Sequence, residues 1–463
     1  MRAIAKSVSL AMVAALSLSA MAMLFVAGPA AAQTAAPAAA PAAAQDPCAA
    51  AAANKQPYTM AEYNAYTAAA SEKNPASQIK LLDDFVSKYP NSALLIYVYP
   101  LYYQNYGAQK NYQRMIEYAD KTAALPCVDA NAKYAALYAH TAGYNALISD
   151  PANGHTVATD AVLAKSGQAA AVAALKALDN FKKPDNVAQD AFDAQKKQLE
   201  IFLYGVAAQA ALIQKDYPDA ITYYKSDLGL KPDDAVMEFK LGQAELNLTP
   251  PATLDGFWDI ARGASSPSAN AKQATELKAY LRKLIANYQQ AACDSLTDAE
   301  FNEMLQLAAA SPTRPDSYKL PSATDLSAAQ KDMTIASVIT DLKAGGDKGK
   351  VTWLAACGLE FPDVPGKIIE VTPGADLTEL KVAFVTSDAE FDAATVPNMD
   401  VKIVGQPDAA RVEKDNAVRF TATLTSYDPD PNFMLHWEKG KVNVEDIPKE
   451  KGAKKPPVHR KPS

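Results

Sequence analysis

Residues 215–234 read KDYPDAITYYKSDLGLKPDD, and this stretch decides how most of the chain is expected to fold. It predicts a helix that ends at Pro232, because proline cannot continue a helix. Inside it a small residue, Ala220, is followed one turn later by an aromatic one, Tyr224. Small residues allow a second helix to approach closely, and rings fill the space beside them. The stretch therefore predicts one half of a helical hairpin.

The spacing of this stretch resembles the second helix and exit turn of a tetratricopeptide repeat (TPR). A repeat period of about 34 residues carries the same register onward into a second unit. The residues that match the repeat signature across the two units are Ala220, Tyr224, Pro232, Leu241, Gly242, Trp258 and Ala261. We therefore expect a mainly α protein, built as a TPR-like α-solenoid of antiparallel helical hairpins.

The helical repeat domain is expected to cover residues 58–310. One helical pair cannot bury its apolar face alone, so pairs stack into a superhelix with a concave groove. Apolar periodicity and proline or glycine breaks predict helices at 78–89, 92–106 with a kink or break at Pro100, 112–125, 158–181, 189–214, 271–290 and 299–310. The last two are expected to close the stack.

The N-terminus has the features of an export signal. Residues 1–32 contain two basic residues, a long apolar stretch and a final Ala-x-Ala, which predicts a signal peptide cleaved before Gln33. The alternative is an uncleaved membrane anchor. Residues 33–57 form an Ala/Pro-rich linker. The chain thus resembles exported bacterial TPR proteins, and this resemblance implies a periplasmic or secreted location.

Four cysteines, Cys48, Cys127, Cys293 and Cys357, would meet an oxidising compartment after export. One or two disulfides are expected, with the pairing left open. None of the cysteines forms a Cys-x-x-Cys pair, so the sequence predicts no zinc site. Nothing in it suggests a cofactor.

The C-terminal third changes character after a linker at 311–325. Residues 326–445 are predicted to form one helix, Leu326–Leu342, followed by a small all-β domain. The expected strands are Gly366–Val371, Leu380–Ser387, Met399–Val404, Val418–Ser426, Phe433–Trp437 and Lys441–Val444. Their order and length resemble the OB-like barrels of exported bacterial proteins. Residues 446–463 are expected to be a basic, disordered tail.

Patterns that suggest catalysis or ligand binding have simpler explanations. Gly345–Val351 lacks the spacing of a phosphate loop and is interpreted as a helix-terminating glycine turn. Asp428–Asn432 starts like a calcium loop but lacks its glycine and glutamate, which favours a hairpin turn. His436 is expected to be packed or exposed rather than catalytic. The chain is therefore not expected to be an enzyme.

The sequence favours a non-enzymatic protein-interaction scaffold of the cell envelope that binds a partner segment in its groove. Tyr97 and Tyr102 are candidate partner-binding residues, since tyrosine offers a large contact area at low entropy cost. The alternative is glycan or nucleic-acid binding by the barrel, with Phe420, Phe433 and Trp437 as a stacking surface. A net charge of −7 makes nucleic acid the weaker choice. Membrane contact is expected only through an uncleaved leader or the basic tail.

Overall fold

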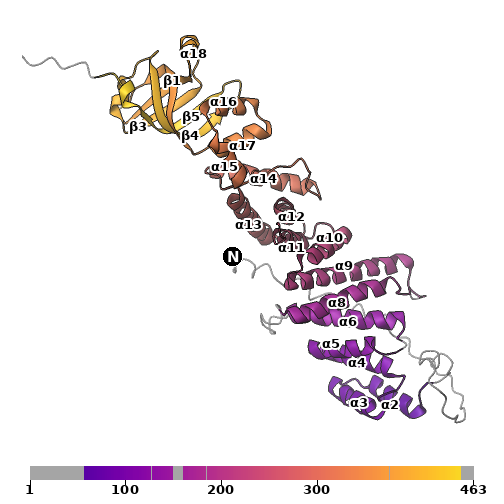
Figure 1. The fold of residues 1–463 in the computed structure, drawn as a ribbon. Helices are drawn as coiled ribbons and strands as arrows, with labels where there is room; N and C mark the ends of the chain where they lie inside the picture. The colour runs from indigo at the N-terminus through magenta and orange to yellow at the C-terminus, as the bar shows by residue number, and fades with distance from the viewer. Residues whose placement is uncertain (1–56, 127, 150–159, 184, 375, 450–463) are drawn as a thin grey trace, which may run out of the picture. The chain divides into compact units, whose positions relative to one another are not determined.

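A computed structural model describes residues 57–126, 128–149, 160–183, 185–374 and 376–449. It is mainly helical and ends in a closed five-stranded barrel (Figure 1). The chain divides into two compact units. The first, the helical unit, runs to Lys278 and includes residues 308–313. The second, the barrel unit, contains residues 279–307 and everything from Arg314 onward, so the division falls inside helix α13.

Helices of the helical unit pack one against the next in sequence order, from α2 to α12 (Figure 1). Their bounds are α2 Met60–Ser71, α3 Pro75–Lys88, α4 Leu95–Ala108, α5 Tyr112–Ala123, α6 Ala130–Ser149, α8 Ala161–Leu178, α9 Gln189–Gln214, α10 Tyr217–Leu230, α11 Ala235–Leu246 and α12 Thr253–Ser265. Several connections are only a few residues long, which favours antiparallel neighbours.

The helix boundaries in residues 215–234 have local causes. Helix α9 ends where Lys215 adopts the left-handed conformation (φ 63°). The Asp216 side chain then accepts a hydrogen bond from the Asp219 amide and caps α10. Pro218 fits the first turn, where a missing N–H costs no helical bond. The chain therefore turns tightly between α9 and α10.

Residues of the repeat signature lie between the helices. Ala220, Tyr224, Trp258 and Ala261 are buried. Gly242 on α11 faces α12 so closely that an added Cβ would lie 2.5 Å from the Gly256 carbonyl oxygen. The signature residues buried in these contacts are Ala220, Tyr224, Leu241, Gly242, Trp258 and Ala261, while Pro232 is exposed in the turn after α10. These positions therefore determine how closely neighbouring helices pack.

Two features of the helical unit differ from the sequence expectations. A kink or a break was predicted at Pro100, and helix α4 continues through this residue without a break. Helix α6 was not predicted, because side chains are buried around much of its circumference and no clean polar face remains to show the helical period. Helix α8 is long and apolar enough to cross a membrane, but it packs between α6 and α9.

The barrel unit combines short helices with one sheet. Its elements are α13 Ala271–Gln289 (from Ala279), α14 Asp294–Ala310 (to Leu307), α15 Ala323–Lys331, α16 Ile335–Ala344, α17 Gly346–Ala356, β1 Glu360–Thr372, β2 Leu377–Phe384, α18 Asp388–Ala393, β3 Met399–Val404, η3 Pro407–Arg411, β4 Ala417–Asp428, β5 Met434–Val442 and η4 Val444–Asp446. The strand order β1-β2-β3-β5-β4 closes through β1 and β4. Only β3 and β5 pair in parallel among these strands. A disulfide joins Cys293 to Cys357.

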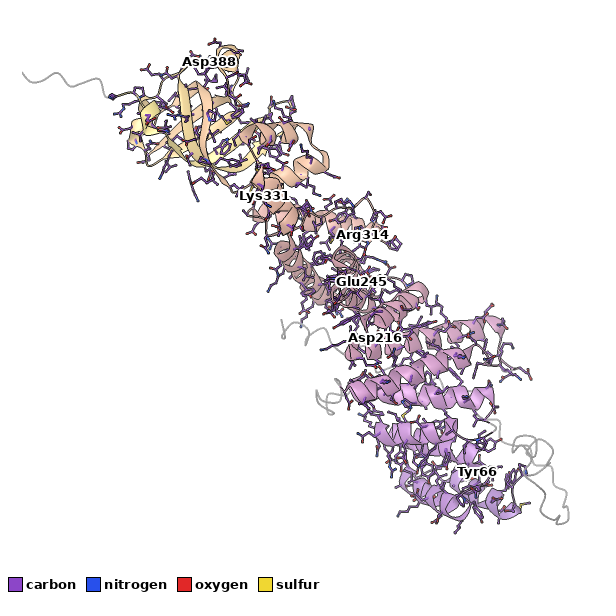
Figure 2. All side chains as sticks on the ribbon, in the orientation of Figure 1. Tyr66, Asp216, Glu245, Arg314, Lys331 and Asp388 are labelled. Atoms are coloured by element: carbon purple, nitrogen blue, oxygen red, sulfur yellow. A yellow bond between two sulfur atoms is a disulfide. The ribbon has the colours of Figure 1, made fainter. Side chains whose placement is uncertain are left out.

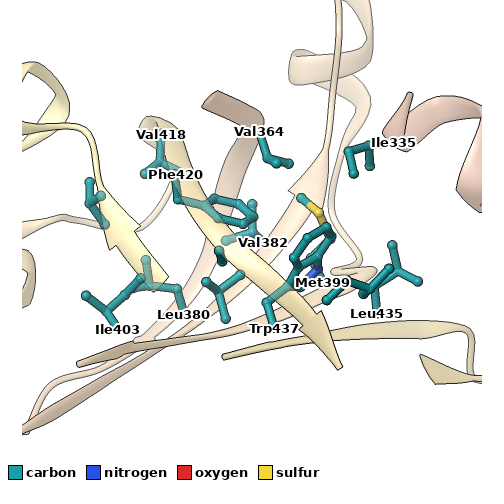
Figure 3. Close-up of a cluster of buried hydrophobic side chains, with 14 of the residues drawn as sticks. Ile335, Val364, Leu380, Val382, Met399, Ile403, Val418, Phe420, Leu435 and Trp437 are labelled. Atoms are coloured by element: carbon teal, nitrogen blue, oxygen red, sulfur yellow. The ribbon is translucent and has the colours of Figure 1, made fainter. Parts of the chain in front are cut away.

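Large apolar side chains fill the barrel interior (Figure 3). Phe420 and Trp437 are almost completely buried, and their rings meet edge to face at 5.9 Å. Phe433 is buried as well. The expected stacking surface of Phe420, Phe433 and Trp437 is therefore wrong, because all three rings belong to the core.

Boundaries in the barrel unit also differ from expectation. The predicted helix Leu326–Leu342 is two helices, because Thr334 caps the start of α16. The two predicted closing strands are one strand, β5. Asp446 accepts hydrogen bonds from Arg419 and Ile447 is buried in the core, so the barrel extends to the residues assigned to the tail.

Two smaller interpretations are confirmed. Gly345, at φ 66°, ends α16 as a glycine turn, and α17 begins directly after it. Residues 429–433 form the hairpin turn between β4 and β5. The predicted signal peptide, Cys48, Cys127 and the basic residues from 450 onward lie outside the described residues.

Candidate functional site

The first helix of the stack carries a group of tyrosines. Helix α2 begins at a capping box in which Thr59 accepts from the Glu62 amide and Glu62 accepts from the Thr59 amide. Tyr63 and Tyr66 follow three residues apart, which places them on adjacent turns of one face. Tyr58 precedes the cap, and Tyr97 comes from α4. We call Tyr58, Tyr63, Tyr66 and Tyr97 the tyrosine surface.

Ring contacts join the tyrosine surface in pairs. The rings of Tyr58 and Tyr63 stack at 5.8 Å, and those of Tyr66 and Tyr97 lie 6.0 Å apart (Figure 2 labels Tyr66). Tyr97 is 44% exposed and nearby Met60 is 55% exposed. Burial raises the pKa of Tyr66, and the phenols of Tyr97 and Tyr63 raise it further. Tyrosine rings from α2 and α4 therefore meet at a partly exposed place.

Tyr102 does not belong to this surface, and its assignment as an outward contact residue is wrong. It is completely buried, its hydroxyl donates to Asp83 at 2.6 Å, and its ring stacks on Tyr118 at 4.0 Å. Burial, and then the Asp83 hydrogen bond, raise its pKa. The five residues from Tyr97 to Tyr102 turn the helix by about 140°, so the two cannot face the same way. Tyr102 packs α4 against α3 and α5.

The tyrosine surface is suited to binding rather than to chemistry. Tyrosine combines a broad apolar face with one hydroxyl and loses little rotamer entropy on contact. Sequence reasoning found Tyr97 but missed Tyr58, Tyr63 and Tyr66. The signal was present in the three-residue spacing of Tyr63 and Tyr66 directly after a Thr-x-x-Glu capping pattern.

A second unusual feature is a group of buried carboxyl groups in α10–α12. Asp227 is buried and neither of its oxygens has a hydrogen-bond partner among the described residues. Burial raises its pKa to about 7, with Asp234 adding to the rise. Burial also raises the pKa of Glu238 to about 7, although a guanidinium nitrogen of Arg262, which lowers this pKa, lies 2.8 Å from the Glu238 carboxylate.

Asp259 on α12 completes this group. Burial raises its pKa, and the neighbouring Glu245 on α11 raises it further. Glu245 itself pairs with Lys225 at 3.0 Å. Among the described residues, no three His, Cys, Asp or Glu side chains are grouped so that they could hold a metal ion. These carboxyl groups are therefore a source of pH-dependent stability.

A third feature lies on the outer face of the barrel. His436 on β5 sits between two carboxylates, with Nδ1 3.3 Å from Asp400 and Nε2 3.0 Å from Asp428. A cavity of about 200 Å³ here is lined by Asp400, Lys402, Thr425, Ser426, Asp428, His436, Trp437 and Glu438. One oxygen of Asp400, Oδ1, is buried without a partner among the described residues.

Comparisons with protein-family models, with curated proteins and with solved structures found no match to this chain. A function is therefore inferred from the geometry of these three features.

Proposed function

We propose that this protein is an exported, non-enzymatic interaction scaffold of the cell envelope, whose helical unit binds an extended segment of a partner protein. The observation that carries the proposal is the tyrosine surface, where the rings of Tyr66 on α2 and Tyr97 on α4 meet and Tyr97 stays 44% exposed. Tyrosine is among the residues most enriched at the energetic centres of protein interfaces. A partner segment laid across α2 and α4 would gain ring contacts and phenol hydrogen bonds together.

The helical unit supports a TPR-like arrangement in its packing. Consecutive helices contact one another from α2 to α12, and the signature residues of two successive units are buried between them, apart from Pro232 in the turn after α10. Gly242 supports it most directly, because only a residue without Cβ permits the approach of α12. Stacked helical pairs of this kind present extended binding surfaces.

Two observations support export. The chain begins with the pattern of a signal peptide. Cys293 and Cys357 form a disulfide, and disulfides persist in oxidising compartments such as the bacterial periplasm. Both are consistent with a periplasmic or secreted protein.

A binding experiment tests the proposed site. Partners would be captured from envelope extract with the full chain, identified, and their affinity measured with purified components. Replacing Tyr66 and Tyr97 with alanine should weaken binding by about tenfold or more, as expected when interface anchors are removed. Tyr204→Ala is the matched control, because Tyr204 is a half-buried tyrosine on α9, outside the tyrosine surface. Equal affinity for the double variant and the control would contradict the proposal.

A second candidate function is glycan binding by the barrel. The strand order β1-β2-β3-β5-β4, with β1 paired to both β2 and β4, is consistent with an OB-like fold, and such barrels bind oligosaccharides and oligonucleotides. Asp400 and Asp428 line the cavity, and their carboxylates would accept hydrogen bonds from sugar hydroxyls. Nearby lysines are paired with acids, Lys381 with Asp400 and Lys402 with Glu438, which disfavours a polyanion.

Calorimetric titration with envelope oligosaccharides tests this candidate. Asp400→Asn should abolish a saturable heat, while Asp408→Asn on η3, away from the cavity, should leave it unchanged. Binding that is insensitive to Asp400→Asn would exclude the cavity as the site.

A further inference from the structure

Three polar side chains from three helices of the helical unit are connected by two successive hydrogen bonds. His140 on α6 is 4% exposed, and its Nδ1 lies 2.6 Å from an Asp120 carboxylate oxygen on α5. Its Nε2 lies 3.1 Å from the hydroxyl oxygen of Ser166 on α8. Ser166 itself is exposed. A buried imidazole thus connects a carboxylate to an accessible hydroxyl.

Close helix packing brings these residues together. Helix α6 lies between α5 and α8 (Figure 1). Gly143, near His140 on α6, approaches Ile116 of α5 so closely that a Cβ would come within 2.9 Å of its side chain. Gly167, next to Ser166, is packed against the Tyr144 ring of α6, where a Cβ would overlap the ring. Both glycines allow α6 to contact its neighbours at the level of His140.

Hydrogen bonding sets the direction of proton transfer. An ionised carboxylate only accepts, so in the neutral imidazole Asp120 holds the proton on Nδ1 and leaves Nε2 as an acceptor. Ser166 then donates its hydroxyl proton to Nε2. Other helical hydroxyls of this unit behave differently, since Thr222 and Ser226 donate to the backbone carbonyl one turn earlier. Ser166 is oriented by a base instead.

We propose that Ser166 is a nucleophilic acylation site, activated by His140 and positioned by Asp120, that accepts an acyl group from an activated ester or thioester. In this step the Ser166 oxygen attacks the acyl carbonyl carbon and its proton passes to His140 Nε2. The carbon–oxygen or carbon–sulfur bond to the leaving group breaks, and that group leaves with the proton from His140. The products are an acyl-serine ester and a free alcohol or thiol.

The arrangement provides a nucleophile, a base and an orienting carboxylate. None of these three groups stabilises the negative charge that develops on the carbonyl oxygen of the acyl group. The proposal is therefore restricted to single acylation of Ser166, without turnover. It goes beyond the proposed scaffold function and is independent of the tyrosine surface, because neither Tyr66 nor Tyr97 contributes to it.

The test uses the full chain and p-nitrophenyl acetate as the acyl donor. Release of p-nitrophenolate would be followed together with intact mass, and the acetylated residue would be located by peptide mapping. One acetyl group on Ser166 is expected, and Ser166→Ala should abolish it. Ser226→Ala is the matched control, since Ser226 is a helical serine without a histidine partner.

Two further variants separate activation from folding. His140→Ala should slow acetylation of Ser166 by about 10²-fold or more, and added imidazole should restore part of the rate. Asp120→Asn should slow it as well while leaving the melting temperature nearly unchanged, because Asp120 is largely exposed. Acetylation of Ser166 no faster than of Ser226, or full reactivity in Asp120→Asn or His140→Ala, would overturn the proposal.

Discussion

The closed β-barrel and the helical unit bury different kinds of side chain, while the short helices beside the barrel bury Glu300 and Asp341. The interior of the barrel is filled by apolar residues such as Phe420 and Trp437, and charged pairs such as Lys381 and Asp400 lie on its outer face. The helical unit instead buries carboxyl groups between α10, α11 and α12, among them Asp227 and Glu238. Burying an ionisable group costs free energy unless the group becomes neutral or is paired with an opposite charge. Stability of the helical unit should therefore depend on pH much more than that of the barrel.

Periodicity explains this difference. A strand alternates inward and outward residues, so a closed barrel can place apolar side chains inside and most charged side chains outside. A helix in a stack contacts neighbours on more than one side. A polar face that one neighbour leaves exposed can therefore be buried by the next helix in the stack. Carboxyl groups are thus enclosed in the stack, where burial raises their pKa values.

The largest expected effect concerns the barrel unit alone. Replacing Cys293 and Cys357 with alanine removes a cross-link between residues 64 positions apart. Without the cross-link the unfolded chain gains conformational entropy, which should lower the free energy of unfolding by about 4 kcal/mol. Thermal unfolding should show a lower transition for the barrel unit and an unchanged one for the helical unit. A shift of both transitions by the same amount would show that the two units do not unfold independently.

A matched glycine pair probes the packing of the helical unit. Gly242→Ala should destabilise it by about 2–3 kcal/mol, because the new Cβ would meet the Gly256 carbonyl and Ile260. Gly229→Ala, on α10 with nothing within 4 Å, should stabilise it by up to about 1 kcal/mol through helix propensity. Chemical denaturation of both variants would measure this contrast. Similar midpoints for the two variants would refute the close α11–α12 contact.

The buried Asp227 predicts a pH effect in the same unit. Its pKa is raised to about 7 in the folded chain, so the folded state holds the proton more tightly than the unfolded state. This contribution to stability is complete below about pH 4 and is lost as the pH rises through about 7. Asp227→Asn should therefore gain stability at pH 8, by up to the roughly 4 kcal/mol to which a pKa shift of this size corresponds, and almost nothing at pH 4. Melting curves across this range would reveal it, and an equal gain at both pH values would contradict it.

The smallest expected effect is at the tyrosine surface. Tyr66→Phe removes the hydroxyl group and keeps the ring that contacts Tyr97, so partner binding should weaken by about 1 kcal/mol. Unfolding free energy should change little, since the ring contact with Tyr97 remains. Affinity and stability measured on the same sample would separate the two effects. Loss of stability without loss of affinity would assign the hydroxyl a structural role.

Much of the architecture was predictable, and the failures have physical causes. The predicted helix at 189–214 matches α9, and all six predicted strands overlap β1 to β5, the last two of them both with β5, because the helix and the strands carry regular spacing of apolar residues. Helix α6 lacked a polar face and gave no such signal. The barrel aromatics were placed on the surface because ring type alone does not say which way a strand faces.

The candidate site was less predictable than the fold. Tyr97 could be identified from its helical position, but Tyr66 joins it only through a contact between α2 and α4. The pairing of Ser166 with His140 likewise joins residues on separate helices. Such contacts between side chains on different helices depend on how the helices pack, which local sequence patterns do not determine.

Site-specific photo-crosslinking measures most directly whether the tyrosine surface is the binding site. A photoreactive phenylalanine analogue would replace Tyr97 in one full-length chain and Lys402, on the outer face of the barrel, in another. Cross-linking to one envelope protein from position 97, lost when Tyr66 is also changed to alanine, is the result that we expect. Cross-linking from position 402 alone, with none from position 97, would contradict the proposed function and favour the barrel.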